Sequence, residues 1–168
     1  AFLRAPLDFA RVSSNFNPNR LHPILKTKRP HKGVDYAAPK GTAVKAAGDG
    51  RVIFRGRNGG YGNCVIIEHG GNITTLYAHL SKFAGSARKG SRVSQGQTIG
   101  YVGATGLATA PHLHYEYRLN GVHRNPRTVP LPEADPVPAE HRDDFLQAAQ
   151  PLLAQLDAIT PTRLARAD

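Results

Sequence analysis

The stretch "HLHYEYRL", residues 112–119, alternates between polar and apolar side chains. Because successive side chains of an extended strand point to opposite faces, His112 and His114 lie on one face together with Glu116. The opposite face carries Leu113, Tyr115, Tyr117 and Leu119. The pattern predicts a half-buried β-strand with two imidazoles on its polar side. These imidazoles belong either to a solvated surface or to a metal-binding or catalytic site.

Outward from this strand, the chain between residues 33 and 120 is a series of short apolar runs separated by turns that contain glycine. Short strands at this spacing are typical of an antiparallel β-sandwich or barrel. We therefore expect a mainly β fold of antiparallel sheets. The expected strands are GVDYAA (33–38), AVKAAG (43–48), GRVIFRG (50–56), GNCVIIEHG (62–70), ITTLYAHL (73–80), QTIGYVG (97–103) and HLHYEYRL (112–119).

The two ends of the chain differ from the middle. Residues 11–30 are rich in polar residues and prolines, and we expect them to wrap the core as a long loop with a short strand at its start. Residues 129–140 form a proline-rich connector, and residues 141–159 have apolar side chains at helical spacing. We expect Pro151 to interrupt or kink this amphipathic helix. Its apolar positions are Phe145, Ala149, Leu152, Leu156 and Ile159.

These segments predict three parts. A β-domain covers residues 1–128 with its core at 31–120, a connector covers 129–140, and a helical extension covers 141–168. We expect the extension to pack on the domain, with binding of a partner as the second interpretation. A chain of 168 residues can form one substantial core without disulfides. Its single cysteine, Cys64, lies in an apolar run and is expected to be packed.

The net charge of the chain indicates which kind of molecule it binds. Lys and Arg number 22 against 12 Asp and Glu, a net charge of +10, which favours anionic partners. The basic residues are scattered, without a basic helix, an RNA-binding signature or zinc-finger spacing, so nucleic acid is not the expected partner. An acidic polymer such as bacterial cell wall, or an anionic membrane surface, fits the charge. The N-terminal stretch has neither a secretion signal nor a transmembrane segment, so we expect a mature form or an excised domain.

Two further motifs carry groups that bind metals. In "HKGVD", His31 and Asp35 have the same parity in an extended chain and can converge, while Gly33 permits a local departure from strand geometry. In "ITTLYAHL", His79 shares the more polar face of its strand with Tyr77. A catalytic zinc site needs three His, Asp or Glu ligands and an open fourth position, whereas a structural site is closed and usually rich in cysteine. One carboxylate and four imidazoles suit the catalytic kind.

The three motifs, HKGVD (31–35), LYAHL (76–80) and PHLHYEY (111–117), resemble those of the lysostaphin/LytM-type zinc metallopeptidases, which cut the peptide part of bacterial peptidoglycan. The resemblance covers about residues 11–128 and is specific, because three separate motifs agree in order and separation. The stretch SSNFNPNRLHPILKTKRPHKGVD (13–35) is more particularly similar to the Gram-negative murein DD-endopeptidase branch, which cleaves D-alanyl–diaminopimelate cross-links.

The resemblance implies a LytM-like fold, built as a duplicated hybrid motif, and one Zn²⁺ ion held by His31, Asp35 and His114. It also implies that His79 and His112 act as general base or acid and stabilise the tetrahedral intermediate when activated water attacks a peptide bond. The implied protein is a zinc metalloendopeptidase that hydrolyses peptidoglycan in the periplasm or outside the cell. Inactive relatives typically lack some of these five residues, so we expect an active enzyme.

Several other residues have two interpretations each. Arg20 and His22 match the family pattern RxHP and either contact substrate or brace the loop. Tyr77 either lies near the site or packs. Glu116 could orient an imidazole, but a solvated surface carboxylate is the preferred interpretation. The histidines outside the motifs are expected at the surface, and they are His69, His123 and His141.

Two other classes of function remain open at this point. A non-catalytic wall-binding or amidase-activating module would keep the fold without cleaving peptide bonds, and a regulatory protein or a missing N-terminal module could occlude the groove of an enzyme. A basic nucleic-acid-binding β-domain would leave the five-residue constellation unexplained. Among enzymes, the second candidate substrate is a glycine-containing bridge or another exported peptide.

Overall fold

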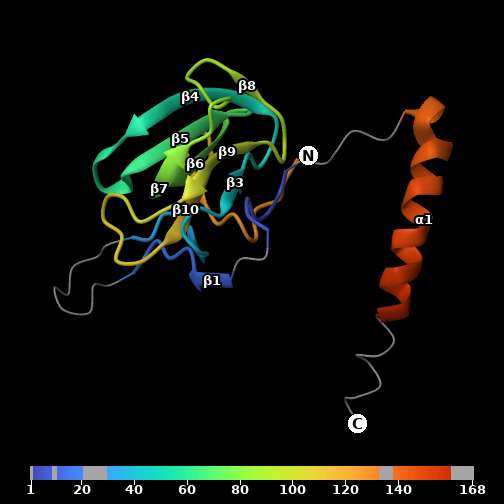
Figure 1. The fold of residues 1–168 in the computed structure, drawn as a ribbon, viewed down its shortest axis with the longest axis horizontal. Helices are drawn as coiled ribbons and strands as arrows, with labels where there is room; N and C mark the ends of the chain where they lie inside the picture. The colour runs from blue at the N-terminus through green and yellow to red at the C-terminus, as the bar shows by residue number, and fades with distance from the viewer. Residues whose placement is uncertain (1, 9–10, 21–29, 133–137, 160–168) are drawn as a thin grey trace, which may run out of the picture. The chain divides into compact units, whose positions relative to one another are not determined.

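The computed structural model describes residues 2–8, 11–20, 30–132 and 138–159. The chain divides into two compact units, Ala1–Glu133 and Ala134–Asp168. The first unit is built from antiparallel β-strands, and the second contains one α-helix (Figure 1). The expected mainly β fold with a C-terminal helix is therefore confirmed.

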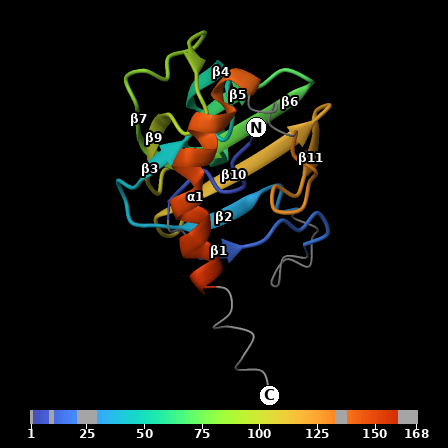
Figure 2. The same cartoon turned by 90° about the vertical axis from the view of Figure 1, so that its right-hand side faces the viewer.

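Most strands belong to one large antiparallel sheet. Its strand order is β1-β2-β10-β6-β5-β4-β8, and β11 pairs with β10. Figure 2 shows β10 beside β2, with β1 beyond β2. The strands are β1 Arg11–Ser14, β2 Val34–Ala37, β4 Gly50–Arg57, β5 Asn63–Glu68, β6 Ile73–Ala78, β8 Arg92–Val93, β10 His112–Leu119 and β11 Val122–Arg124.

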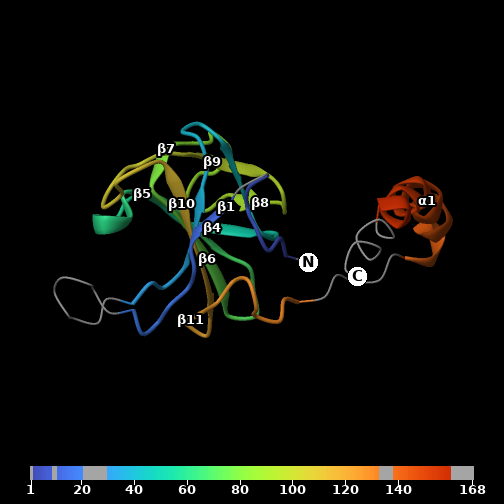
Figure 3. The same ribbon diagram turned by 90° about the horizontal axis from the view of Figure 1, so that it is seen from below.

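A second, smaller sheet has the order β3-β9-β7. Figure 3 shows β7 and β9 layered over part of the large sheet. These strands are β3 Ala43–Lys45, β7 Leu80–Phe83 and β9 Thr98–Val102. The layering makes a sandwich, because alternate side chains of both sheets turn inward.

The main core lies between the two sheets. From the large sheet it takes Leu113 and Tyr115 of β10, which form the apolar face that the alternating sequence predicts. The small sheet contributes Leu80, Ile99 and Val102, all without solvent exposure. Further large-sheet members of this core are Val34, Tyr36, Val52, Val65, Ile67, Tyr77 and Val93. Cys64 is fully buried in a separate small cluster, so its expected packing is confirmed.

Two expectations about the strands are wrong. Strand β10 is not half-buried, because the polar side chains His114 and Glu116 are buried on its second face. The run 73–80 is not one strand: β6 ends at Ala78, His79 has a φ of 60°, and β7 begins in the other sheet. A positive φ is uncommon outside glycine, and it turns the chain between the sheets here.

The segments around the predicted strands agree in part with expectation. β1 forms at the start of the 11–30 segment, as expected, while residues 21–29 lie outside the described part of the chain. The alternating pattern did not indicate the short strands β8 and β11, which follow glycine-containing turns. A 3-10 helix, η1 Gly59–Tyr61, connects β4 to β5.

The second unit contains a 3-10 helix, η2 Ala139–His141, followed by α1 Arg142–Ile159. Asp143 and Asp144 lie in the first turn of α1, where negative charge is favourable to the helix dipole. Of the two effects expected at Pro151, an interruption or a kink, the interruption is wrong, because the helix runs through this residue. Proline removes one backbone hydrogen bond, and the remaining turns can continue on either side. No helix among the described residues combines the length and apolarity needed to cross a bilayer.

Candidate metal centre and catalytic groove

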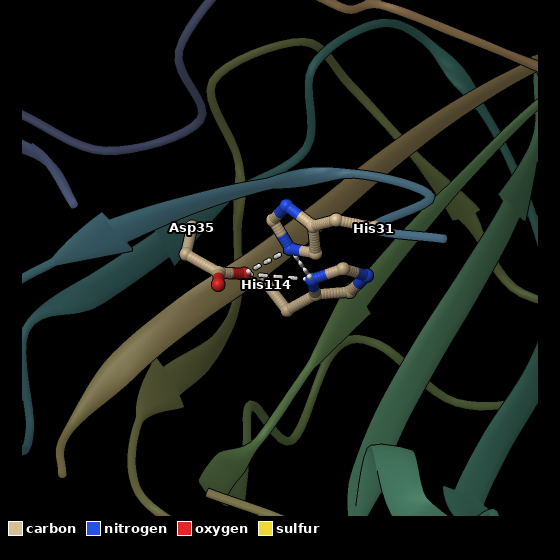
Figure 4. A group of neighbouring side chains, drawn as sticks. All are labelled: His31, Asp35 and His114. Carbon is tan, nitrogen blue, oxygen red and sulfur yellow. Dashed lines mark hydrogen bonds and ion pairs between the residues drawn. The ribbon is translucent and has the colours of Figure 1, made fainter. Parts of the chain in front are cut away.

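The pairing of β2 with β10 brings Asp35 and His114 together. The two residues are opposite each other in the register of these strands. His31 precedes β2 and is held by a backbone bridge to Asn17. The close approach depends on Gly33, because a Cβ atom there would collide with the carbonyl oxygen of Tyr115 and lie 2.9 Å from the His114 ring. Side chains from two segments far apart in sequence, residues 31–35 and His114, therefore converge (Figure 4).

Three donor atoms meet within this cluster. Asp35 Oδ1 lies 2.7 Å from His114 Nδ1 and 3.1 Å from His31 Nε2. The two ring nitrogens are 3.3 Å apart. Ligands bound tetrahedrally to zinc at about 2.0–2.1 Å are separated from one another by about 3.3 Å. The cluster is thus close to the size that a zinc ion requires, and the His, Asp and His donors are of the type that zinc prefers.

The remaining ring nitrogens of the two histidines have acceptors of their own. His31 Nδ1 donates to the backbone carbonyl of Asn15 at 2.6 Å. His114 Nε2 donates to Glu116 Oε1 at 3.1 Å. Such contacts select the tautomer whose other nitrogen carries a lone pair. When both rings are neutral, their lone pairs are therefore directed at the cluster.

The electrostatics of the cluster favour positive charge. Burial alone would raise the pKa of Asp35, but hydrogen bonds from His114 and His31 outweigh it and hold the pKa well below its usual range. Burial alone would lower the pKa of His114, but Asp35 and Glu116 outweigh it and raise the pKa to about 9. The proton that His114 retains therefore lies where a metal cation could bind.

His79 and His112 lie beside this cluster with their rings 4.6 Å apart. His79 Nδ1 donates to the carbonyl of Thr105 at 2.8 Å, and His112 Nδ1 donates to the carbonyl of Ala110 at 2.8 Å. His112 Nε2 is 3.9 Å from Asp35 Oδ1. In each neutral ring, Nε2 is therefore the unprotonated nitrogen. Burial lowers the pKa of His79, which keeps its ring neutral and able to accept a proton.

All five motif residues line one groove of about 790 Å³. Arg20, exposed, also lines it, whereas His22 lies outside the described residues. The other lining residues are Pro30, Gly60, Tyr61, Gly106, Leu107, Ala108 and Thr109. Sequence reasoning missed Tyr61 and the 106–109 loop, because neither carries a metal-ligand motif. The one feature of the sequence that marks these segments is the number of glycines around them.

Glycines bring these two groove walls together. A Cβ on Gly62 would collide with the backbone of Thr105, and one on Gly106 would collide with the backbone nitrogen of Gly62. The Thr105 side chain accepts a hydrogen bond from the Asn63 backbone at 2.9 Å. Thr105 also holds His79 through its carbonyl, so the contact between the loops positions a groove imidazole.

Several single-residue expectations need correction. Tyr77 is fully buried beside Tyr115 and does not line the groove, so it packs. Glu116 is fully buried and is not a solvated surface carboxylate. His69 and His123 are partly buried and hydrogen-bonded, to Asp49 and Thr75 and to Glu116 respectively. His141 is exposed, as expected.

Comparison with known proteins identifies the family and fold that the three sequence motifs resemble. The sequence model of peptidase family M23 matches residues 29–126. The chain is 49% identical over 157 residues to the peptidoglycan DD-endopeptidase ShyC of Vibrio cholerae, covering 94% of this chain and 36% of ShyC. It is 50% identical over 159 residues to the DD-carboxypeptidase/endopeptidase Mpg of Neisseria meningitidis, covering 94% of this chain and 36% of Mpg.

A similar fold occurs in the crystal structure of a zinc-containing peptidase from Vibrio cholerae. The TM-score is 0.75 at 40% sequence identity, and the match covers 79% of this chain and 41% of that one. The chain spans about a third of the length of the curated relatives it matches. The shared region includes all five motif residues.

Proposed function

The chain belongs to peptidase family M23, and on that premise we propose that it is a zinc-dependent peptidoglycan endopeptidase that hydrolyses D-alanyl–diaminopimelate cross-links. The observation that carries the proposal is the convergence of three donor atoms, from His31, Asp35 and His114, beside two imidazoles in one groove. The names of the relatives ShyC and Mpg support the choice of reaction and wall polymer.

In this proposal, His31 Nε2, Asp35 Oδ1 and His114 Nδ1 would hold the metal, because the separations of these atoms suit a zinc ion. When bound, zinc supplies a Lewis acid that polarises the scissile carbonyl and lowers the pKa of a water molecule. Three protein ligands would be the number that a catalytic zinc site has.

His79 and His112 handle the proton and the negative charge. Because Nδ1 of each ring already donates to a backbone carbonyl, Nε2 of each ring is left to act in the groove. One Nε2 takes the proton of the attacking water, and the protonated ring then delivers it to the departing amine. The other imidazole, which takes a proton from solvent at Nε2 before the reaction, would donate it as a hydrogen bond to the oxygen that gains negative charge. Both rings touch each other, so they can act on one peptide bond.

The substrate in this proposal is a carboxylate-bearing wall polymer. The exposed guanidinium of Arg20 at the groove can pair with a carboxylate of the peptide stem. The net charge of +10 favours the same kind of polymer over longer distances. We place the activity in the periplasm or outside the cell, where peptidoglycan lies. Control by a regulatory protein or by a further module of a longer protein belongs to the proposal as well.

The test is digestion of purified diaminopimelate-type peptidoglycan, with products identified by mass spectrometry. We expect cross-linked dimers to become monomers, the reaction to stop with a chelator, and zinc to restore it. Release of the terminal D-alanine from monomers would add a carboxypeptidase activity of the kind that the name of Mpg includes. Absence of cleavage by zinc-loaded protein would contradict the proposal and favour a wall-binding or amidase-activating module.

A further inference from the structure

We propose that Glu116 is a positioning residue, which orients the His114 ring and makes its Nδ1 a stronger metal ligand. The inference rests on the proposed function, because it assumes that His114 binds the metal. It assigns a task to a buried carboxylate that the proposed reaction does not use directly. Glu116 follows His114 by two residues on β10, so both side chains lie on one face of the strand.

The contact between the two residues is buried. Glu116 is fully buried, and the His114 side chain is 10% exposed. His114 Nε2 donates to Glu116 Oε1 at 3.1 Å, on the side of the ring away from Asp35. A hydrogen bond to a carboxylate is stronger where water is excluded. Glu116 therefore holds the ring in one orientation and one tautomer.

The two oxygens of Glu116 have different partners. Oε2 accepts from Arg118 Nε at 3.0 Å and from His123 Nε2 at 3.0 Å. Oε1 accepts from the Tyr61 hydroxyl at 2.7 Å in addition to His114. A carboxylate present only to neutralise Arg118 would need Oε2 alone. The second oxygen is directed at the proposed metal ligand and at a residue of the groove wall.

This arrangement affects the metal site through the imidazole. A carboxylate that accepts a hydrogen bond from Nε2–H increases the electron density on the ring. Nδ1 thereby becomes a stronger ligand for a cation. Loss of such a partner typically weakens metal affinity by about 10–100-fold. Arg118 and His123 keep the carboxylate itself from moving, because both bind its other oxygen.

The experiment compares zinc affinity in four proteins by competition with a chromophoric chelator. Glu116→Gln keeps the shape of the side chain without its charge, and Glu116→Asp keeps the charge but withdraws it from His114. The matched control is Glu68→Gln, because Glu68 is an exposed carboxylate of the same sheet. We expect both Glu116 variants to lose about 10–100-fold in zinc affinity and the control to stay within about twofold of wild type.

Cobalt provides a second readout that a structural role would not change. The visible absorption of bound Co²⁺ reports ligand geometry, and we expect it to change in the Glu116 variants alone. Wild-type zinc affinity in either folded Glu116 variant overturns the inference. Failure of the wild type to bind zinc would instead overturn the proposed function, so the two failures are distinct.

If the Glu116 variants do not fold, a measurement on the wild type still tests the inference. In the zinc-loaded protein labelled with ¹⁵N, His114 should show a proton on Nε2 that exchanges slowly with water, since it is buried against Glu116. Rapid exchange of that proton, or its absence, would contradict the assignment.

Discussion

At the scale of single residues, His112 and His114 differ in what their ring nitrogens do. Both project from one face of β10, yet His114 directs Nδ1 at Asp35, whereas His112 commits Nδ1 to the carbonyl of Ala110. Their exposure differs too, since the His114 side chain is 10% exposed and that of His112 is 18%. The spacing of two residues thus places one imidazole in the proposed metal cluster and one beside it, and both line the groove.

The two roles predict different effects of mutation. His114→Ala should lose both zinc and hydrolysis, because it removes one of the three proposed ligands. His112→Ala should keep zinc affinity close to wild type and lose cross-link hydrolysis by at least about 100-fold, the usual effect of a general acid or base. Metal content by atomic emission and hydrolysis of a cross-linked muropeptide dimer check both. Equal zinc loss in the two variants would contradict the division of roles.

Gly33 is the second residue whose role can be tested directly. Gly33→Ala should destabilise the protein by about 1–3 kcal/mol and weaken zinc binding, because the added Cβ collides with the Tyr115 carbonyl and crowds the His114 ring. Thermal unfolding and zinc titration measure the two effects. Gly85→Ala is the control, since a Cβ there meets nothing within 4 Å. Zinc affinity unchanged in Gly33→Ala would mean that the ring tolerates displacement.

At the scale of elements, the alternating pattern predicts strands well and their breaks poorly. Parity correctly separates His114 from Leu113, because β10 is a continuous strand. It places Tyr77 and His79 on one face, but Tyr77 lies in the core and His79 lines the groove. The reason is the φ of 60° at His79, which reverses the direction of the side chain relative to regular strand geometry.

The candidate site was predictable to the extent that its chemistry lies in short motifs. The five motif residues could be named from the sequence, because their types match the ligands and bases of zinc hydrolases. The loop that contains Thr105 and the buried state of Glu116 could not, since both depend on contacts between distant segments, with Asn63 and Tyr61 respectively. A local pattern records which face a side chain takes, and says little about what later covers that face.

A hydrogen-bond chain that runs from the surface into the core connects the end of β5 to β6. His69 Nδ1 donates to the carbonyl of Asp49 at 2.7 Å, so neutral His69 accepts at Nε2 from the Thr75 hydroxyl at 2.7 Å. Thr75 Oγ1 lies 3.0 Å from the buried Tyr77 hydroxyl, which accepts from the Ala47 backbone at 2.8 Å. If His69 gained a proton, Nε2 could no longer accept, and one buried hydroxyl would lose its acceptor.

This chain predicts a pH dependence of stability. Burial lowers the pKa of His69 below 6.5 in the folded protein, so the unfolded chain binds the extra proton first. The contribution of neutral His69 is complete above about pH 6.5 and is lost as the pH falls through the folded pKa. Between pH 7.5 and 5, urea unfolding of the chelated wild type should lose more stability than that of His69→Asn.

The asparagine variant keeps a donor for the Asp49 carbonyl but does not titrate. His141→Asn serves as the control, because His141 is exposed. A wild type and His69→Asn that lose stability in parallel would contradict the proposed role of His69.

At the scale of the whole molecule, every described residue of the proposed site belongs to the first unit, Ala1–Glu133. We therefore expect a variant that ends at Glu133 to keep zinc affinity and hydrolysis of a soluble cross-linked dimer close to wild type. The unit has its own core and both sheets, so it can fold without residues 134–168. Loss of zinc binding by the shortened chain would assign the helical unit a part in forming the site.

The chain passes from the large sheet to the small sheet at His79, and this separates the proposed metal ligands from one of the two proposed proton-transfer residues. The proposed ligands come from β2, its preceding residues and β10, all within or beside the large sheet. His79 occupies the point where the chain leaves that sheet for β7 of the small one. A shift of the small sheet would therefore move one of the two imidazoles that we propose for proton transfer, relative to the proposed ligands on the large sheet. The proposed hydrolysis thus needs both layers in register, whereas the three donor atoms lie within or beside one layer.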